Sequence, residues 1–274
     1  MKLKFTKMHG LGNDFVLLDG IRGRLPPVKK MAKKLCDRRF GIGCDQLLVL
    51  EKSRRADFKM AIFNADGSQV EMCGNGLRCL AHYIHAKKLS RNKVFTIETL
   101  KGIQVARLMS GDQVEIDMGE PCLEAEEIPV KLTGQVLNHA LWVEDREFRV
   151  TCLSMGNPHC VIFVEELDDF PFEKYGPLLE HHPLFPNRVN AEFVQVHSSS
   201  AVEMRVWERG AGETLACGSG ACAVAVAAHL NHLVGRQVAV QLKGGVLKIH
   251  WNQENNHVLM TGPAALVYEG VIDV

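Results

Sequence analysis

The stretch Cys73-Gly74-Asn75-Gly76 returns as Cys217-Gly218-Ser219-Gly220, a shift of 144 positions from 73 to 217. Each stretch opens a segment of helical character, predicted over residues 75–88 in the first case and 219–233 in the second. The second segment is apolar all the way round, so a helix there must be enclosed on every side. A repeated turn that opens an enclosed helix indicates a duplicated structural unit.

Other landmarks keep the same shift without a gap. They are Gly12-Asn13 onto Gly156-Asn157, Gln46 onto Asn190, and Ile62-Phe63-Asn64 onto Val206-Trp207-Glu208. Each half therefore carries an early Gly-Asn turn, a mid-half amide, a strand that ends in a polar residue, and a Cys-Gly-x-Gly turn before a helix. This order predicts that the chain is two copies of one domain.

Short segments of alternating apolar and polar residues predict strands in both halves. The predicted strands cover residues 2–8, 15–19, 47–51, 58–64, 94–99, 104–108 and 114–118, and then 148–153, 160–164, 192–197, 202–208, 238–242, 246–251 and 258–261. A third helix, with one apolar face and a lysine-rich outer face, is predicted over residues 27–39. The expected fold is α/β (α+β) with two pseudo-symmetric domains, each a curled, barrel-like mixed β-sheet around a central apolar helix.

Domain boundaries follow from the repeat and from two proline positions. Pro121 and the acidic residues 124–127 predict a linker, and Pro263 predicts a return point. The expected domains are residues 1–119 plus 264–274, which contain Cys73, and residues 120–263, which contain Cys217.

The composition favours a small-molecule partner. Lysine plus arginine and aspartate plus glutamate both number 32, so no overall field attracts nucleic acid or an anionic membrane. The stretch from Met1 to Phe15 has no apolar run behind its lysines, and the apolar runs elsewhere are too short for a membrane span. We therefore expect a cytoplasmic protein that binds neither nucleic acid nor membrane.

Nine cysteines form no even framework and no Cys-x-x-Cys pair, so neither disulfides nor a metal site is expected. Seven are predicted to be small buried hydrophobic residues: Cys36, Cys44, Cys79, Cys122, Cys152, Cys160 and Cys222. The remaining two, Cys73 and Cys217, stand at the repeated turns.

The opening of a helix is a favourable place for a carboxylate and for a thiolate. Backbone N–H groups there lack intrahelical partners and the helix dipole is positive, so the turn binds an anion and lowers the pKa of a nearby thiol. If the pseudo-twofold axis brings the turns together, their amides hold one carboxylate while Cys73 and Cys217 flank the adjoining carbon. That geometry suits inversion at the α-carbon, because one thiolate removes a proton and the opposite thiol delivers another.

Glu208 and His159 are the nearest candidates for setting the pKa values of the two thiols, which we expect to titrate as a coupled pair. His159 lies two residues past the repeated Asn157, although a histidine there can equally be a hydrogen-bonded structural residue. The helix openings would stabilise the developing negative charge in place of a pyridoxal imine. No cofactor is therefore expected.

Four stretches resemble the signature sequences of the diaminopimelate epimerase family. They are His9-Gly10-Leu11-Gly12-Asn13-Asp14-Phe15, residues 64–78 with Asn64-Ala65-Asp66-Gly67-Ser68 and Cys73-Gly74-Asn75-Gly76-Leu77-Arg78, Met155-Gly156-Asn157-Pro158-His159, and residues 208–220 with Glu208-Arg209-Gly210-Ala211-Gly212-Glu213-Thr214. The likeness covers the chain from end to end. It implies interconversion of LL- and meso-2,6-diaminoheptanedioate, a step toward lysine and peptidoglycan precursors.

The resemblance also implies roles for individual residues. Cys73 and Cys217 would be the acid and base, and Asn13, Gln46, Asn64, Gly74, Asn75, Asn157, Asn190, Glu208, Arg209, Gly218 and Ser219 would surround the substrate. Arg209 can hold the carboxylate and Glu208 the ammonium of the amino-acid group that does not react. Many family members are homodimers, and Tyr268 is similar to a dimer-contact position, although ordinary core packing would also explain a tyrosine there.

Two other functions use the same residues. A proline or hydroxyproline racemase would carry the same cysteine turns, but Arg209 and Glu208 favour a ligand with an extra charged end. A non-catalytic binding protein or redox sensor would instead use Cys73 and Cys217 as a switchable disulfide.

Overall fold

The computed structural model describes residues 2–23 and 25–273. The chain folds as two compact units. Unit 1 comprises Met1–Asp117 and Thr261–Val274, and unit 2 comprises Met118–Met260. The expected boundaries, after residues 119 and 263, lie two and three residues beyond these divisions.

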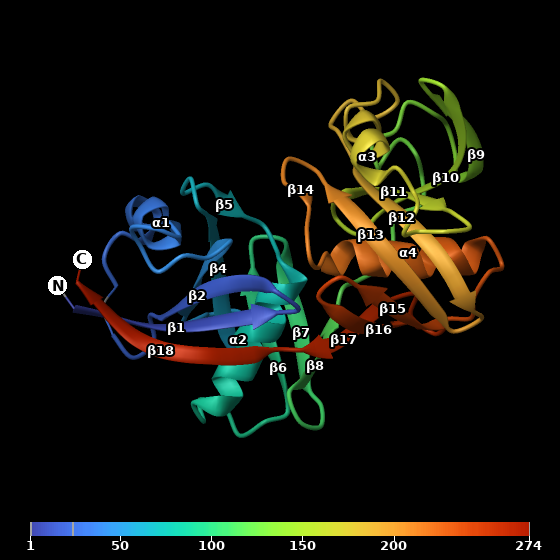
Figure 1. Cartoon of the computed structure of the whole chain (residues 1–274). Coiled ribbons are helices and arrows are strands. Elements are labelled where there is room, and N and C mark those ends of the chain that lie inside the picture. Colours follow the sequence, from blue (N-terminus) through green and yellow to red (C-terminus); the bar gives the residue numbers. More distant parts are fainter. Residues whose placement is uncertain (1, 24, 274) are drawn as a thin grey trace. The chain divides into compact units, whose positions relative to one another are not determined.

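Unit 1 is a mixed sheet curled around helix α2 (Gly74–Ala86) (Figure 1). The strands are β1 (Lys2–Gly10), β2 (Asn13–Asp19), β3 (Gln46–Glu51), β4 (Phe58–Asn64), β5 (Gln69–Val70), β6 (Val94–Thr99), β7 (Gly102–Leu108), β8 (Gln113–Asp117) and β18 (Ala265–Asp273). Two strand pairs in this unit are parallel, β2 with β3 and β4 with β6. The antiparallel pairs are β1 with β18, β1 with β2, β3 with β4, β4 with β5, β6 with β7 and β7 with β8. Helix α1 (Val28–Cys36) covers the outside through Ala32 and Leu35.

Unit 2 repeats this arrangement around helix α4 (Gly218–Leu230) (Figure 1). The strands are β9 (Val136–Val143), β10 (Arg146–Ser154), β11 (Pro158–Phe163), β12 (Asn190–Ser198), β13 (Ala201–Glu208), β14 (Gly212–Glu213), β15 (Gln237–Leu242), β16 (Gly245–Trp251) and β17 (Val258–Pro263), whose last residues fall in unit 1. Strands β11 and β12 are parallel, as are β13 and β15. Helix α3 (Phe172–Glu180) covers the outside, where its Phe172 and Leu179 are buried.

The structural repeat has the same shift as the sequence repeat. The bounds of β1, α1 and α2 become the bounds of β10, α3 and α4 when they are increased by the number of residues that separates residue 73 from residue 217. The pairing register moves with them, since Phe15 faces Gln46 between β2 and β3, and His159 faces Asn190 between β11 and β12. The prediction of two pseudo-symmetric domains, each a curled mixed sheet around a central helix, is confirmed.

The central helices are enclosed as their composition requires. All residues from Ala221 to Ala228 are buried in α4, and α2 is buried over most of its length. Both helices end earlier than predicted because Lys88 and His232 take positive φ angles of 54° and 60° and donate back to the last turn. No helix within residues 2–23 and 25–273 is long and apolar enough to cross a membrane.

Several elements were not predicted. Helix α3 was missed because its Gly176-Pro177 pair is typical of a helix end. The repeat could have predicted it, since α1 shifted by the repeat coincides with α3. Strands β5, β9, β14 and β18 were also missed. The helix predicted over residues 27–39 ends at Cys36, because Asp37 accepts hydrogen bonds from the N–H groups of Arg39 and Phe40 and forms a turn.

The seven cysteines predicted as buried hydrophobic residues follow that prediction with one exception. Cys122 is only partly buried, and its sulfur lies 3.2 Å from Glu127 Oε2. Its pKa is raised by burial first and by that hydrogen bond next. The other six are buried.

Candidate active site

In unit 1, Cys73 caps the start of α2. Its backbone is extended, with φ −141° and ψ 115°, and its carbonyl accepts the N–H of Leu77 at 2.9 Å as the first bond of the helix. The Cys73 sulfur lies 3.9 Å from Asn13 Oδ1, which also accepts a 3.1 Å hydrogen bond from Asn75 Nδ2. Asn13 thus joins the first turn of α2 to the start of β2.

The other polar residues predicted in this half lie at the same edge of the sheet. Strand β3 begins at Gln46 beside the start of β2, and antiparallel β4 ends opposite it at Asn64. Gln46 Nε2 donates to Asn64 Oδ1 at 2.9 Å, and Asn64 Nδ2 donates to Ser68 Oγ at 3.0 Å. Three strand ends therefore bring Asn13, Gln46 and Asn64 to one edge.

Unit 2 builds a matching edge with different side chains. Asn157 precedes β11, Asn190 begins β12 and Glu208 ends β13. Asn190 Nδ2 donates to the Pro158 carbonyl at 2.8 Å, and its Oδ1 accepts the Arg209 N–H at 3.0 Å. Arg209 is exposed at this edge, and one of its guanidinium nitrogens donates to the Asn187 carbonyl. Glu208 accepts a hydrogen bond from Thr214.

Cys217 caps α4 as Cys73 caps α2, but its sulfur is buried. It accepts the Gly220 N–H at 3.4 Å and lies 3.6 Å from Ser219 Oγ. Burial raises the pKa of Cys217 well above its usual range, and the Glu208 and Glu192 carboxylates raise it further, while the hydrogen bonds from Ser219 and Gly220 lower it. The helix opening therefore lowers the pKa of Cys217, as expected, but desolvation outweighs this effect and the net shift is upward.

The raised pKa gives a prediction for thiol alkylation without substrate. The midpoint of the pH dependence for iodoacetamide labelling of Cys217 will lie above that of the same cysteine in the unfolded chain, which titrates at about 8.5. Mass spectrometry of the labelled peptide follows the rate. Restricted access slows labelling at every pH without moving the midpoint, so an unshifted midpoint would contradict the prediction.

Glu192 was not predicted from the sequence, although it lies beside this site. It follows Asn190 by two residues in β12, so both side chains are on one face, and neither Glu192 nor His159 is exposed to solvent. Glu192 Oε1 lies 2.6 Å from His159 Nδ1, and His159 Nε2 lies 3.1 Å from Asn157 Oδ1. A carboxylate in an otherwise apolar buried strand was the signal that could have identified it.

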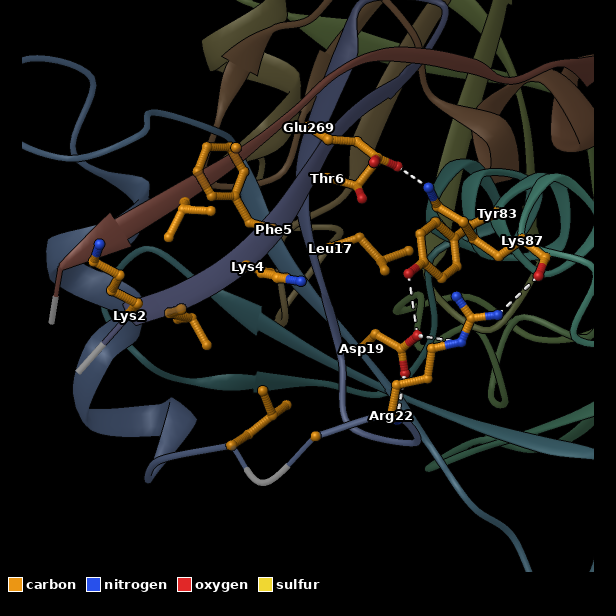
Figure 2. Close-up of a pocket in the computed structure, with 15 residues that line it drawn as sticks. Lys2, Lys4, Phe5, Thr6, Leu17, Asp19, Arg22, Tyr83, Lys87 and Glu269 are labelled. Carbon is orange, nitrogen blue, oxygen red and sulfur yellow. Dashed lines mark hydrogen bonds and ion pairs between the residues drawn. The ribbon is translucent and has the colours of Figure 1, made fainter.

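A separate pocket of about 670 Å³ lies in unit 1, near the C-terminal end of α2 and so at the opposite end of the helix from Cys73 (Figure 2). Its polar groups bind one another. Tyr83 donates to Asp19 at 3.1 Å, Arg22 pairs with Asp19 and donates to the Lys87 carbonyl, and Lys87 pairs with Glu269. Because these groups satisfy one another, the pocket is not the candidate site.

The described residues contain no group of three His, Cys, Asp or Glu side chains arranged to hold a metal ion. Tyr268 is not packed in the core, since it is 45% exposed and contacts the Phe5 ring edge-on at 5.9 Å.

Comparison with known proteins identifies the family. The model of the family described as Diaminopimelate epimerase matches residues 5–124 and 151–267. The chain is 51% identical to the diaminopimelate epimerase of Acetivibrio thermocellus, with 99% of each chain covered, and 49% identical to that of Methanococcus maripaludis, with 99% of this chain and all of the other covered.

Two solved structures share the fold at low identity. A hydroxyproline epimerase from Agrobacterium vitis with bound trans-4-hydroxy-L-proline superposes with a TM-score of 0.72 at 16% identity, over 99% of this chain and 92% of the other. A phenazine biosynthesis protein of the PhzF family from Bacillus anthracis gives the same TM-score and identity over the whole of both chains. From the family match and the full-length identities, this chain belongs to the diaminopimelate epimerase family of isomerases.

Proposed function

We propose that this protein interconverts LL- and meso-2,6-diaminoheptanedioate, without a bound cofactor, by proton transfer at the α-carbon. The observation that carries the proposal is the paired architecture of the candidate site. Cys73 and Cys217 each cap a buried helix at the sheet edge that also gathers the amide and carboxylate side chains. The reaction would serve lysine and peptidoglycan precursor synthesis.

Two cysteines are needed because the reaction inverts a carbon. A single base would return the proton to the face from which it came, whereas two thiols on opposite faces remove it on one side and supply it on the other. The α-proton is weakly acidic, so the carboxylate must be stabilised as negative charge develops on it. Backbone N–H groups of Gly74, Asn75, Gly218 and Ser219 would supply this, each well-placed donor contributing on the order of 10²–10³ in rate.

Recognition of the amino-acid group that does not react falls to the residues that differ between the halves. Asn64 and Glu208 hold equivalent places in the repeat, so the two halves match at their cysteines and differ at this position. Glu208 would meet the distal ammonium and Arg209 the distal carboxylate. The remaining substrate contacts are proposed to be Asn13, Gln46, Asn157 and Asn190.

Isotope exchange tests the proposed function. In D₂O, the purified protein will incorporate deuterium at the α-carbon of diaminopimelate, interconvert its LL and meso isomers, and leave proline and hydroxyproline unlabelled. Mass spectrometry and chiral chromatography follow both substrates. Exchange with proline but not with diaminopimelate would overturn the proposal in favour of a proline-type racemase, to which the Agrobacterium vitis structure is related by fold.

We also propose a cytoplasmic homodimer, with the two units as its folding domains. The supporting feature is β18, which leaves apolar side chains exposed: Val267, Tyr268 and Val271 are 53%, 45% and 56% exposed. Sedimentation velocity should show a dimer for the wild type and a shift toward monomer for Tyr268→Ala, because truncating a hot-spot aromatic at the centre of an interface costs about 2 kcal/mol or more. A dimer of unchanged stability in the variant would exclude a dimer contact that depends on Tyr268. The cytoplasmic assignment rests on the nine cysteines and their lack of an even framework.

A further inference from the structure

The buried Glu192–His159 pair breaks the internal repeat of the fold. By the shift of the repeat, His159 corresponds to Phe15 and Glu192 to Leu48, and both of those side chains are fully buried and apolar. The strands match as well, since Leu48 faces Ile62 and Glu192 faces Val206 across equivalent antiparallel pairs. The fold can therefore fill these two places with hydrocarbon, and one half does so.

An ionisable pair at such places needs a reason other than packing. Burying charged groups carries a desolvation penalty that apolar residues of similar volume avoid. Here burial raises the pKa of Glu192, although His159 opposes this, and within the part of the chain that the structure describes Glu192 Oε2 has no hydrogen-bond partner. A pair with one unsatisfied oxygen is a poor means of stabilising a core.

The pair reaches a residue of the candidate site. His159 Nε2 lies 3.1 Å from Asn157 Oδ1, and in the other half Asn75 Nδ2 makes the corresponding 3.1 Å bond to Asn13 Oδ1. Residue 219, the counterpart of Asn75, is a serine. In unit 1, therefore, Asn75 orients the Asn13 amide. In unit 2 the equivalent amide, that of Asn157, is contacted by His159, and His159 is itself held by Glu192.

Glu192 also lies beside the cysteine turn. A Cβ atom at Gly220 would lie 2.9 Å from Glu192 Oε1 and 3.2 Å from Cys217 Sγ, so that oxygen and that sulfur border the same small space. At the equivalent Gly76 the nearest atom is a methyl carbon of Leu48. One half therefore has a carboxylate behind its cysteine turn where the other has hydrocarbon.

We propose that Glu192 is a positioning residue that holds the His159 imidazole, and through it the Asn157 amide, against the Cys217 turn, so that the two cysteines of the reaction act unequally. The inference rests on the proposed epimerase function. The groups around Glu192 are His159 on β11, Cys217 at the start of α4, Glu208 at the end of β13 and Cys160 on β11. His159 Nδ1 lies within hydrogen-bond distance of Glu192 and His159 Nε2 within hydrogen-bond distance of Asn157, so the ring is fixed at both of its nitrogens.

The test compares Glu192→Gln with a matched control. Glu203→Gln removes the carboxylate of a second histidine–glutamate pair in the same unit, His197–Glu203, which is solvent-exposed with a separation of 3.0 Å. Glu192→Gln is expected to lower kcat/KM for LL-diaminopimelate by about 10- to 100-fold, the range found when a carboxylate that orients a metal-bound histidine is removed. The loss should fall mainly on kcat, change the ratio of deuterium exchange from the LL and meso isomers, and shift the pH profile. Glu203→Gln should change none of these.

A double variant separates positioning from folding. His159→Phe with Glu192→Leu places in unit 2 the apolar pair that unit 1 carries, so the protein should stay folded with a melting temperature no lower than the wild type. It should nevertheless lose at least as much activity as Glu192→Gln. A folded Glu192→Gln protein with wild-type kcat/KM and isomer ratio, or a fully active double variant, would overturn the inference.

The spectroscopic readout keeps the inference separate from the proposed function. In the wild type the His159 Nδ1 proton, bonded to a carboxylate oxygen 2.6 Å away, should give a far-downfield NMR signal that Glu192→Gln removes and Glu203→Gln leaves. If that signal behaves as expected but the wild type exchanges no diaminopimelate proton, the proposed function fails while the linkage stands. If the wild type exchanges normally and the signal is absent, the inference fails alone.

Discussion

Cys73→Ala and Cys217→Ala will each abolish epimerisation, with kcat reduced by at least about 10²–10⁴, the range for removing a general acid or base. Each variant keeps one thiol, so either can retain deuterium exchange with the single stereoisomer whose α-proton faces that thiol. Chiral chromatography measures epimerisation, and mass spectrometry in D₂O measures one-sided exchange. The two assays together distinguish a lost acid or base from a misfolded protein.

Cys122→Ser is the matched control for these variants. Its sulfur is partly exposed and lies next to Glu127, outside both cysteine turns, so activity should equal that of the wild type. Normal turnover by Cys73→Ala or by Cys217→Ala would rule out the two-base scheme. Full activity after alkylation of both thiols would do the same.

Gly220→Ala is expected to lower kcat by about 100-fold or more, because displacing reacting groups by about 1 Å can cost that much. The added Cβ would lie 2.9 Å from Glu192 Oε1 and 3.2 Å from Cys217 Sγ, closer than normal contact allows. Glu192 cannot swing away freely, since it is fully buried and bonded to His159. The methyl group therefore displaces the Cys217 turn, whose sulfur accepts the Gly220 N–H.

Gly235→Ala makes the same chemical change at a place with room for it. A Cβ there has its nearest neighbour, the Ser199 carbonyl oxygen, at 3.8 Å, so this variant should keep wild-type kcat and stability. Steady-state kinetics and thermal denaturation of both variants provide the comparison. A Gly220→Ala protein with kcat within about twofold of the wild type would show that this turn tolerates displacement, contrary to its proposed role.

Much of the fold could be predicted because the duplicated domain is visible as an internal repeat in the sequence. The shift that links Cys73 to Cys217 also relates the bounds of α2 to those of α4. Helix and strand periodicity is a local property, so the two central helices and most strands followed from spacing alone. Helix α3 was not predicted because Gly176 and Pro177 interrupt its helical pattern in the sequence. Its packing against the outside of the unit 2 sheet stabilises it nevertheless.

The sequence also predicted most of the side chains that gather at one edge of each sheet, since strand ends and helix openings place particular side chains there. What the tertiary structure decided is the environment of those side chains. The pKa of Cys217 depends on burial and on two carboxylates from other strands, and Glu192 gains its place beside His159 only because β11 and β12 pair in parallel. Desolvation and cross-strand neighbours depend on residues that are far apart in the chain. The helix-opening turns, by contrast, are short local patterns of adjacent residues, and their repetition can be seen in the sequence directly.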